Sequence, residues 1–283
     1  MEGEEQSVVV QAGGSALDTT VFHNQFIVLD SGYASGVTLN DGGMTIQGSA
    51  AQAHNVTVNA QGDYALYNDG GALYDTIVNS GGGVVEYADG GRSGGISYNT
   101  VVNEGGFDIV LTGQTQNETV NAKGIQELAS VSASAIKTDV ASGGQLSAVK
   151  GSAISATIEG GGSLLVGSQG QAQNTRVEGG GSSFIQSGGK AEQTELQKGA
   201  FQTVEVGGVA SDTLISTGRQ NVYGSAVGGS ATALGEEYVM SGGEDSGMVV
   251  TSHGHEIVQS GGVAENTTFL AQGFGYINGT LIS

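Results

Sequence analysis

Histidine side chains are the first groups in this sequence whose spacing could support chemistry. His253 and His255 flank Gly254 and would share one face of a strand, which could begin a metal site. No third ligand follows at a matching spacing, and His23 and His54 are single. We therefore expect these histidines at corners or on the surface.

Carboxylates are the second candidate for chemistry. A sugar lyase or hydrolase needs clustered acids in a groove, usually beside Arg or Lys. The arginines Arg92, Arg176 and Arg219 are at least 43 residues apart, and the densest acidic patch joins Glu236-Glu237 to Glu244-Asp245. We expect these carboxylates to point outward into solvent, with a cation or catalytic site as the alternative. The sequence predicts no enzyme.

Calcium is a plausible ligand for an acidic, glycine-rich chain. The calcium-binding nonapeptide G-G-x-G-x-D-x-U-x is absent, however, and the repeat described below is longer than nine residues. The Asp-Gly-Gly sequences at 41–43, 69–71 and 89–91 are more simply turns. We therefore expect no cofactor and no metal ion.

Two columns of short polar side chains are the most suggestive feature. Threonines and asparagines recur one repeat apart at outward positions of the same predicted strand. They are Thr38, Asn40, Thr57, Asn59, Asn79, Asn103, Thr119 and Asn121. One interpretation is a solvated face with stacked asparagines, and the other is a flat surface for association or glycan attachment. Threonine arrays also suit ice binding, which the broken threonine column makes a minor alternative.

An internal repeat must position these side chains. The pattern G-x-A-x-x-T-x-V-x-x-G-G can be placed fourteen times, at a mean spacing of about 19 residues. A large apolar residue follows the first position by seven residues in 13 of 14 copies, and Ala231 is the exception. Because one unit of this length cannot bury its apolar face, the units must stack on one another.

Each repeat is expected to contain two short strands with glycine corners, so the predicted fold is an all-β parallel β-solenoid of about 14 turns. The second strand should point alternate residues inward, as in Met44/Ile46, Leu164/Val166 and Phe107/Ile109/Leu111. Extra residues at 89–94 should loop out. The short turn at 219–223 should tighten or kink the stack.

We expect three segments: a tail or cap over 1–12, the repeat domain over 13–273 and a truncated end over 274–283.

With 8 Lys and Arg against 28 Asp and Glu, a nucleic-acid partner is not expected. The longest apolar runs are too short for a membrane helix. The acidic N-terminus does not resemble a secretory signal.

The repeat G-G-x-A-x-x-T-x-V-x-x-G-G, its period and the absence of cysteine resemble the passenger domains of AIDA-type self-associating autotransporters. That resemblance implies a right-handed β-helix on the surface of a Gram-negative bacterium, although the signal peptide and barrel of such proteins are not in this sequence. It also implies self-association, biofilm formation or adhesion to host glycans or proteins. Heptose added by a heptosyltransferase would occupy outward residues such as Thr38, Thr57 and Thr119.

A glycan-binding or glycan-processing β-helix remains the alternative function. It would need a groove with aromatic residues beside paired carboxylates. Tyr87, Tyr98 and Tyr238 are the candidate stacking residues.

Overall fold

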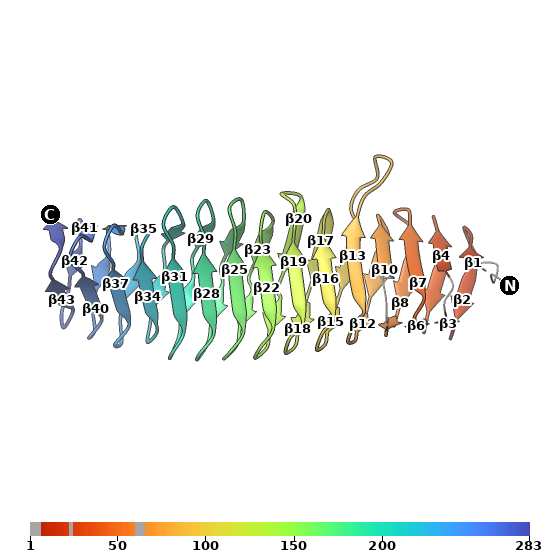
Figure 1. Cartoon of the computed structure of the whole chain (residues 1–283), viewed down its shortest axis with the longest axis horizontal. Helices are drawn as coiled ribbons and strands as arrows, with labels where there is room; N and C mark the ends of the chain where they lie inside the picture. Colours follow the sequence, from red (N-terminus) through yellow and green to blue (C-terminus); the bar gives the residue numbers. More distant parts are fainter. Residues whose placement is uncertain (1–6, 23–24, 60–65) are drawn as a thin grey trace. The chain divides into compact units, whose positions relative to one another are not determined.

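A computed structural model describes residues 7–22, 25–59 and 66–283 of the chain. Within these residues the regular structure is entirely short parallel β-strands, arranged as a β-solenoid of about 14 turns (Figure 1). The chain divides into an N-terminal unit, residues 1–138, and a C-terminal unit, residues 139–283. The all-β solenoid predicted from the repeat is confirmed.

Each turn contains three strands, which form sheets B, C and A in chain order, so the prediction of two strands was wrong. In the N-terminal unit, sheet A contains β1 (Ser7–Val10), β4 (Gln25–Leu29), β7 (Gly43–Gln47), β10 (Leu66–Asp69), β13 (Gly83–Tyr87), β16 (Phe107–Val110) and β19 (Ile125–Leu128). Sheet B contains β2 (Ser15–Leu17), β5 (Tyr33–Ser35), β8 (Gln52–His54), β11 (Ala72–Tyr74), β14 (Ile96–Tyr98), β17 (Gly113–Gln116) and β20 (Ala133–Ile136). Sheet C contains β3 (Thr20–Phe22), β6 (Thr38–Asn40), β9 (Thr57–Val58), β12 (Ile77–Val78), β15 (Val101–Val102) and β18 (Thr119–Val120).

The C-terminal unit repeats this arrangement. Its sheet A contains β22 (Gln145–Ala148), β25 (Ser163–Val166), β28 (Ser182–Ile185), β31 (Phe201–Val204), β34 (Arg219–Val222), β37 (Glu236–Val239), β40 (His255–Val258) and β43 (Phe274–Ile277). Sheet B contains β23 (Ser152–Ile154), β26 (Gln171–Gln173), β29 (Lys190–Glu192), β32 (Val209–Ser211), β35 (Ser225–Val227), β38 (Glu244–Ser246), β41 (Val263–Glu265) and β44 (Thr280–Ile282). Sheet C contains β21 (Asp139–Val140), β24 (Thr157–Ile158), β27 (Arg176–Val177), β30 (Glu195–Leu196), β33 (Leu214–Ile215), β36 (Ser230–Ala231), β39 (Val249–Val250) and β42 (Thr268–Phe269).

The corner between sheets B and C explains the additional strand. Asn174 follows β26 in a left-handed conformation, with φ 53, and Asp75 and Asn99 occupy the same place with φ 54 and φ 57. Short polar side chains tolerate this conformation better than other residues with a Cβ. The chain therefore bends sharply within the A-x-x-T segment. One strand ends before the bend and another begins after it, where the sequence pattern suggested a corner and a single strand.

The glycine at the first position of the repeat, which we call the anchor glycine, is required because neighbouring turns pack closely there. A Cβ added at Gly170 would lie 1.8 Å from the carbonyl oxygen of Ala148, one turn away. No side chain fits at that distance, because real non-bonded atoms stay at least about 3 Å apart. This approach accounts for the predominance of glycine at the first repeat position, where only Ala51 and Ala133 replace it.

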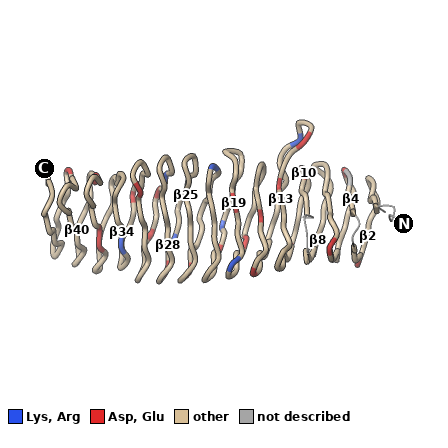
Figure 2. The backbone as a smooth tube through the Cα atoms, in the orientation of Figure 1, with Lys and Arg blue, Asp and Glu red and all other residues tan. Residues whose placement is uncertain are grey.

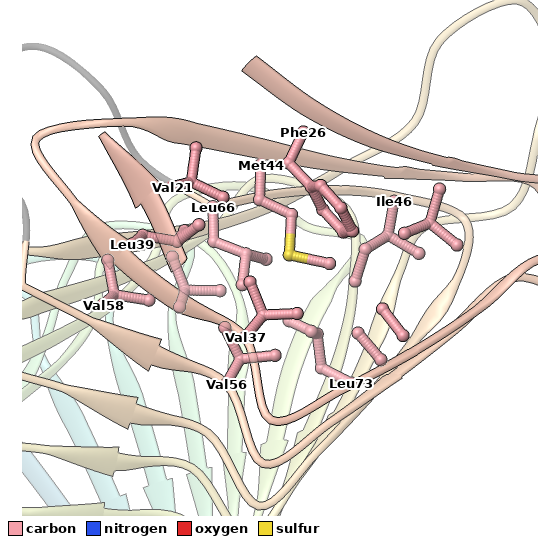
Figure 3. Close-up of a cluster of buried hydrophobic side chains, with 14 of the residues drawn as sticks. Val21, Phe26, Val37, Leu39, Met44, Ile46, Val56, Val58, Leu66 and Leu73 are labelled. Carbon is pink, nitrogen blue, oxygen red and sulfur yellow. The ribbon is translucent and has the colours of Figure 1, made fainter. Parts of the chain in front are cut away.

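The core is a set of columns in which like residues stack in register. In the N-terminal unit, Phe26, Met44 and Leu66 pair across neighbouring strands, and all three are buried (Figure 3). In the C-terminal unit, sheet B contributes a column of small residues. It consists of Ala153, Ala172, Ala191, Ala210 and Ala226. Each turn thus buries an apolar face that it could not bury alone.

The inward residues of the second predicted strand are only partly as expected. Met44, Ile46, Leu164 and Val166 are buried. The prediction for 107–111 was wrong, because Asp108 and Val110 point into the core and Leu111 is 42% exposed. Alternation fixes which residues share a face but not which face is inside.

The irregular turns keep the sheet register. The extra residues between β13 and β14 loop out as predicted, and Figure 1 shows this excursion clearly. At the short turn, β34 pairs in register with β31 and β37, and only Tyr223 and Gly224 connect it to β35. This turn is therefore shorter than its neighbours at its corners, while its strands keep their register.

The structure describes only part of the expected terminal segments, 1–12 and 274–283. Residues 1–6 and His23 lie outside the described residues, and Ser7–Val10 form β1. At the other end, β43 and β44 pair with β40 and β41. In the part of the chain that the structure describes, no helix has the length and apolarity needed to cross a membrane.

Candidate functional site

The asparagine ladder, formed by Asn40, Asn59, Asn79, Asn103 and Asn121, runs along sheet C of the N-terminal unit. Each asparagine after Asn40 donates from Nδ2 to Oδ1 of the asparagine one turn earlier. The four N–O distances are 3.0, 2.6, 2.9 and 2.8 Å in chain order. The predicted stacking of these side chains is therefore present as a continuous hydrogen-bond chain.

The ladder uses part of the hydrogen-bonding capacity of each amide. An asparagine amide has two N–H donors and an oxygen with two lone pairs. The ladder takes one donor and one lone pair from each inner member, such as Asn59 and Asn79, and all five side chains are half-buried. The ladder stiffens this edge and leaves one N–H of each amide for a partner.

The threonine column lies on the same sheet. Thr38 and Thr57 are paired in register, and both are half-buried. Ile77 and Val101 occupy the next two positions of the column, and Thr119 follows them. The structure thus places all eight predicted residues in the strands of sheet C or directly after them, with the threonines in two groups.

An aromatic stack on sheet B was missed by the sequence analysis. The His54 ring stacks on Tyr74 with centroids 4.3 Å apart, and Tyr74 stacks on Tyr98 at 5.0 Å. Tyr33 tilts against His54 at 5.3 Å. His54 therefore has ring partners on both sides, and a comparison of residues three positions after each anchor would have revealed most of the stack.

The other two tyrosines considered for glycan stacking contact neighbouring turns. Tyr87 meets Tyr67 edge to face at 6.0 Å. Tyr238 lies under the Arg219 guanidinium, 4.6 Å from the ring centroid. Arg219 also forms an ion pair with Glu236 at 2.6 Å, so these groups are engaged in contacts between turns.

The remaining arginines also pair across turns. Arg92 Nη1 lies 2.8 Å from the buried Asp69 carboxylate, and Arg176 Nε lies 3.5 Å from Glu195. Figure 2 shows basic and acidic residues together on the loop after β13, which contains Arg92. The arginines are isolated in sequence, but stacking places an acidic partner beside each of them.

The histidine pair does not share a strand face, and His253 lies at a corner, as expected. His253 lies exposed in the turn before β40, with φ 66. His255 lies within β40, where its ring packs edge-on against Phe274 at 5.6 Å and Tyr276 at 6.0 Å. The left-handed turn at His253 separates the two side chains.

The predicted acidic surface patch is partly interior, which corrects the expectation that its carboxylates point outward. Glu237 and Asp245 are buried with exposures of 0% and 1%, and Glu256 joins them from the next turn with 0%. Each contributes a carboxylate oxygen to a group that spans no more than 4.8 Å. We call these three residues the C-terminal carboxylate cluster.

Burial raises the pKa of every member of this cluster. For Glu237 the pKa lies well above its usual value because of desolvation first, and then the charges of Asp245 and Glu256. Desolvation and the Glu256 charge raise the pKa of Asp245 to about 7. Desolvation also raises the pKa of Glu256 to about 6, against the lowering effect of the Thr267 hydroxyl.

A second interior group, the N-terminal carboxylate cluster, consists of Glu86, Asp108 and Glu118. Neutral donors reach all three members. The Ser97 hydroxyl donates to Glu86, and Gln126 Nε2 donates to Glu118 and, at 3.5 Å, to Asp108 Oδ2. Desolvation, followed by the Asp108 charge, raises the pKa of Glu86 and of Glu118 well above the usual value. These residues replace apolar members of the inner columns, since Asp108 pairs with Val84 and Glu86 with Val110.

Comparisons with known proteins agree with the repeat. Residues 140–200 match a family model described as "Adhesin of bacterial autotransporter system, probable stalk", AIDA. The crystal structure of a TibC-catalyzed hyper-glycosylated TibA fragment superposes with a TM-score of 0.75 at 27% identity. That match covers 95% of this chain and 99% of the other. The repeat is therefore similar to that of AIDA-type stalks. The expected resemblance to AIDA-type autotransporter passengers is confirmed.

Two further comparisons add no argument about function. The Azotobacter vinelandii mannuronan C-5 epimerase AlgE4 A-module aligns with a TM-score of 0.37 and 11% identity, over 98% of this chain and 88% of that one. No curated protein matches the chain. The family model and the TibA fragment support an adhesin role, and a glycan-processing role is less supported.

The comparisons also bear on function. The comparisons support a surface adhesin passenger, a structural and secreted segment associated with the cell surface. They are also compatible with glycosylation, because the TibA fragment is itself hyper-glycosylated.

Proposed function

We propose that this chain mediates self-association between bacterial cells through sheet C of its N-terminal unit. The observation that carries the proposal is the asparagine ladder, which presents identical amides at the strand spacing over five turns. Copies of such a face can form many weak contacts, each worth about 1 kcal/mol net, and repetition makes the sum substantial. No catalytic activity is part of this proposal.

Cell settling tests the association surface. Cells displaying the chain should aggregate, and replacing Asn40, Asn59, Asn79 and Asn103 with Asp should slow settling. Like charges would then face one another both within the ladder and between copies. The formal charge of −20 already opposes association, so added salt should speed settling of the native chain.

A matched control variant carries the same number of Asn→Asp substitutions at positions outside the ladder. The same substitution at Asn174, Asn221, Asn266 and Asn278 adds four charges outside sheet C. Asp is compatible with the left-handed corner of Asn174 and Asn266, because Asp212 adopts it at φ 53. Equal settling of the two variants, with both folded by circular dichroism, would refute the proposed surface.

We further propose that Thr38, Thr57 and Thr119 accept O-linked heptose from a heptosyltransferase. The similarity to a hyper-glycosylated TibA fragment supports glycosylation in general. Each threonine is partly accessible, whereas Thr175 is 1% exposed and provides a buried comparison. Intact mass after coexpression with the transferase should fall when the three threonines are changed to Ala. Replacing Thr175 with Ala should leave the added mass unchanged, and an equal loss would contradict the assignment.

A further inference from the structure

The C-terminal carboxylate cluster is built from two consecutive turns. Glu237 in β37 and Glu256 in β40 are paired in register, and Asp245 projects from β38 of sheet B. Asp245 interrupts the alanine column, since Ala226 precedes it and Ala264 follows it in register. Small apolar residues suit this position in the neighbouring turns, so core packing does not explain an aspartate there.

Hydrogen bonding within the cluster is almost absent. Both oxygens of Glu237, both of Asp245 and Oε2 of Glu256 are buried without a hydrogen-bond partner. Thr267 donates to the remaining oxygen, Glu256 Oε1, at 3.1 Å. The backbone amides of Ser246 and Met248 face Asp245 and lower its pKa without reaching hydrogen-bond geometry. Five unsatisfied oxygens in one place are costly in a dry interior.

The neighbouring turns do not supply the missing donors. Gln220, in register with Glu237, directs its Nε2 at Gln202 Oε1, 3.1 Å away, and therefore extends a ladder that runs away from the cluster. On the other side, Gly275 pairs with Glu256 and offers no side chain. The Phe269 ring occupies the space that a side chain at position 275 would fill.

In the N-terminal carboxylate cluster every carboxylate accepts at least one hydrogen bond from a neutral side chain, although one oxygen of each acid also lacks a partner. There, Ser97 and Gln126 donate to the carboxylates, and Thr138 donates to Gln126 Oε1 at 3.0 Å. The C-terminal carboxylate cluster has one hydroxyl donor for three carboxylates. Its acids therefore require a partner that the polypeptide does not provide.

We propose that Glu237, Asp245 and Glu256 bind one calcium ion inside the C-terminal unit. Carboxylate oxygens are the ligands of hard cations, and Ca²⁺–O bonds of about 2.3–2.6 Å place opposite ligands about 4.6–5.2 Å apart. One carboxylate oxygen from each residue lies within 4.8 Å of the other two, which fits this distance. Mg²⁺ needs opposite ligands about 4.0–4.2 Å apart and near-ideal octahedral geometry. This inference is independent of the proposed self-association.

Calcium binding to the full chain tests the proposal. After treatment with a chelator, the chain is titrated with CaCl2, and bound ions are counted by equilibrium dialysis while the urea midpoint is followed. One ion per chain should bind and raise the midpoint, because a ligand that binds only the folded state at 100 times its Kd shifts the folding equilibrium about 100-fold. MgCl2 should produce a smaller shift, and NaCl of equal ionic strength accounts for screening of the −20 charge.

Two variants of β38 separate specific binding from screening. Asp245→Ala restores the alanine column and should fold, yet it should neither bind the ion nor respond to calcium. Glu244→Ala removes a carboxylate from an exposed neighbour on the same strand and should respond as the native chain does. Equal midpoint shifts in both variants, or no calcium bound by the native chain, would overturn the proposal.

Discussion

Asn79 Nδ2 lies 2.6 Å from Asn59 Oδ1 across one turn of sheet C, and Asn79 Oδ1 accepts from Asn103 at 2.9 Å. Asn79 is thus a central member of the asparagine ladder, bonded on both sides. Asn121, at the end of the ladder, makes a single ladder bond, to Asn103.

Replacing Asn79 with Ala should destabilise the N-terminal unit by about 1–2 kcal/mol, because two half-buried hydrogen bonds of about 1 kcal/mol net are lost. Asn121→Ala should cost about half as much, since it removes one bond. Urea unfolding of both variants measures the difference. Equal losses of unfolding free energy in the two variants would show that the number of ladder bonds does not determine the loss.

The stability of the N-terminal unit should decrease as pH rises. Burial raises the pKa of Glu86 and Glu118 in the folded state, so the folded chain binds protons more tightly than the unfolded chain. The stabilisation from protonating these two carboxyls is complete below the usual Glu pKa of about 4.3. It is lost as pH rises toward their raised pKa values in the folded state. Urea midpoints measured between about pH 4 and pH 8 test this dependence.

A neutral variant distinguishes this effect from the general repulsion of an acidic chain. Glu118→Gln keeps an oxygen that can accept from Gln126 and removes the titrating group, so its midpoint should vary less with pH. Glu127→Gln changes a partly exposed neighbour on β19 and should retain the native slope. A native slope in Glu118→Gln would contradict the assignment.

Arg92→Ala should destabilise the turn that contains the loop at 88–95. Asp69 is fully buried, and it would keep only the donors Gln47 Nε2 at 3.2 Å and Asp89 N at 2.9 Å. Because Arg92 is 38% exposed, solvent weakens the pair, and we expect a loss of about 1–2 kcal/mol in urea unfolding. Lys123→Ala breaks an exposed pair with Glu104 and should cause no measurable change. An equal effect in both variants would argue against a special role for buried Asp69.

The solenoid could be predicted from the sequence because each column repeats. A large apolar residue seven positions after the anchor appears as Val58, Val78 and Val102, and these residues do stack in register in the core. The third strand could not be predicted as easily, since it depends on a backbone bend at residues such as Asn174. Local backbone geometry of this kind leaves only a weak compositional signal.

The asparagine ladder was predictable because identical polar residues recur at one repeat position. The interior carboxylates were missed because charged residues are almost never fully buried without partners, which makes an outward assignment the natural one. The column signal was nevertheless present: Glu237 and Glu256 stand at the same repeat position as buried Leu164 and Gln202. Alignment by column, and not residue type alone, would have placed them inside.

The loop between β13 and β14 has a practical consequence. The register on both sides is unaffected by it, since β13 pairs with β16 and β11 with β14 as in other turns. Exposed loops tolerate insertion when the backbone they interrupt makes few hydrogen bonds. A foreign epitope or affinity tag could therefore be grafted at this corner if Asp89 and Arg92, which contact the buried Asp69, are kept in place.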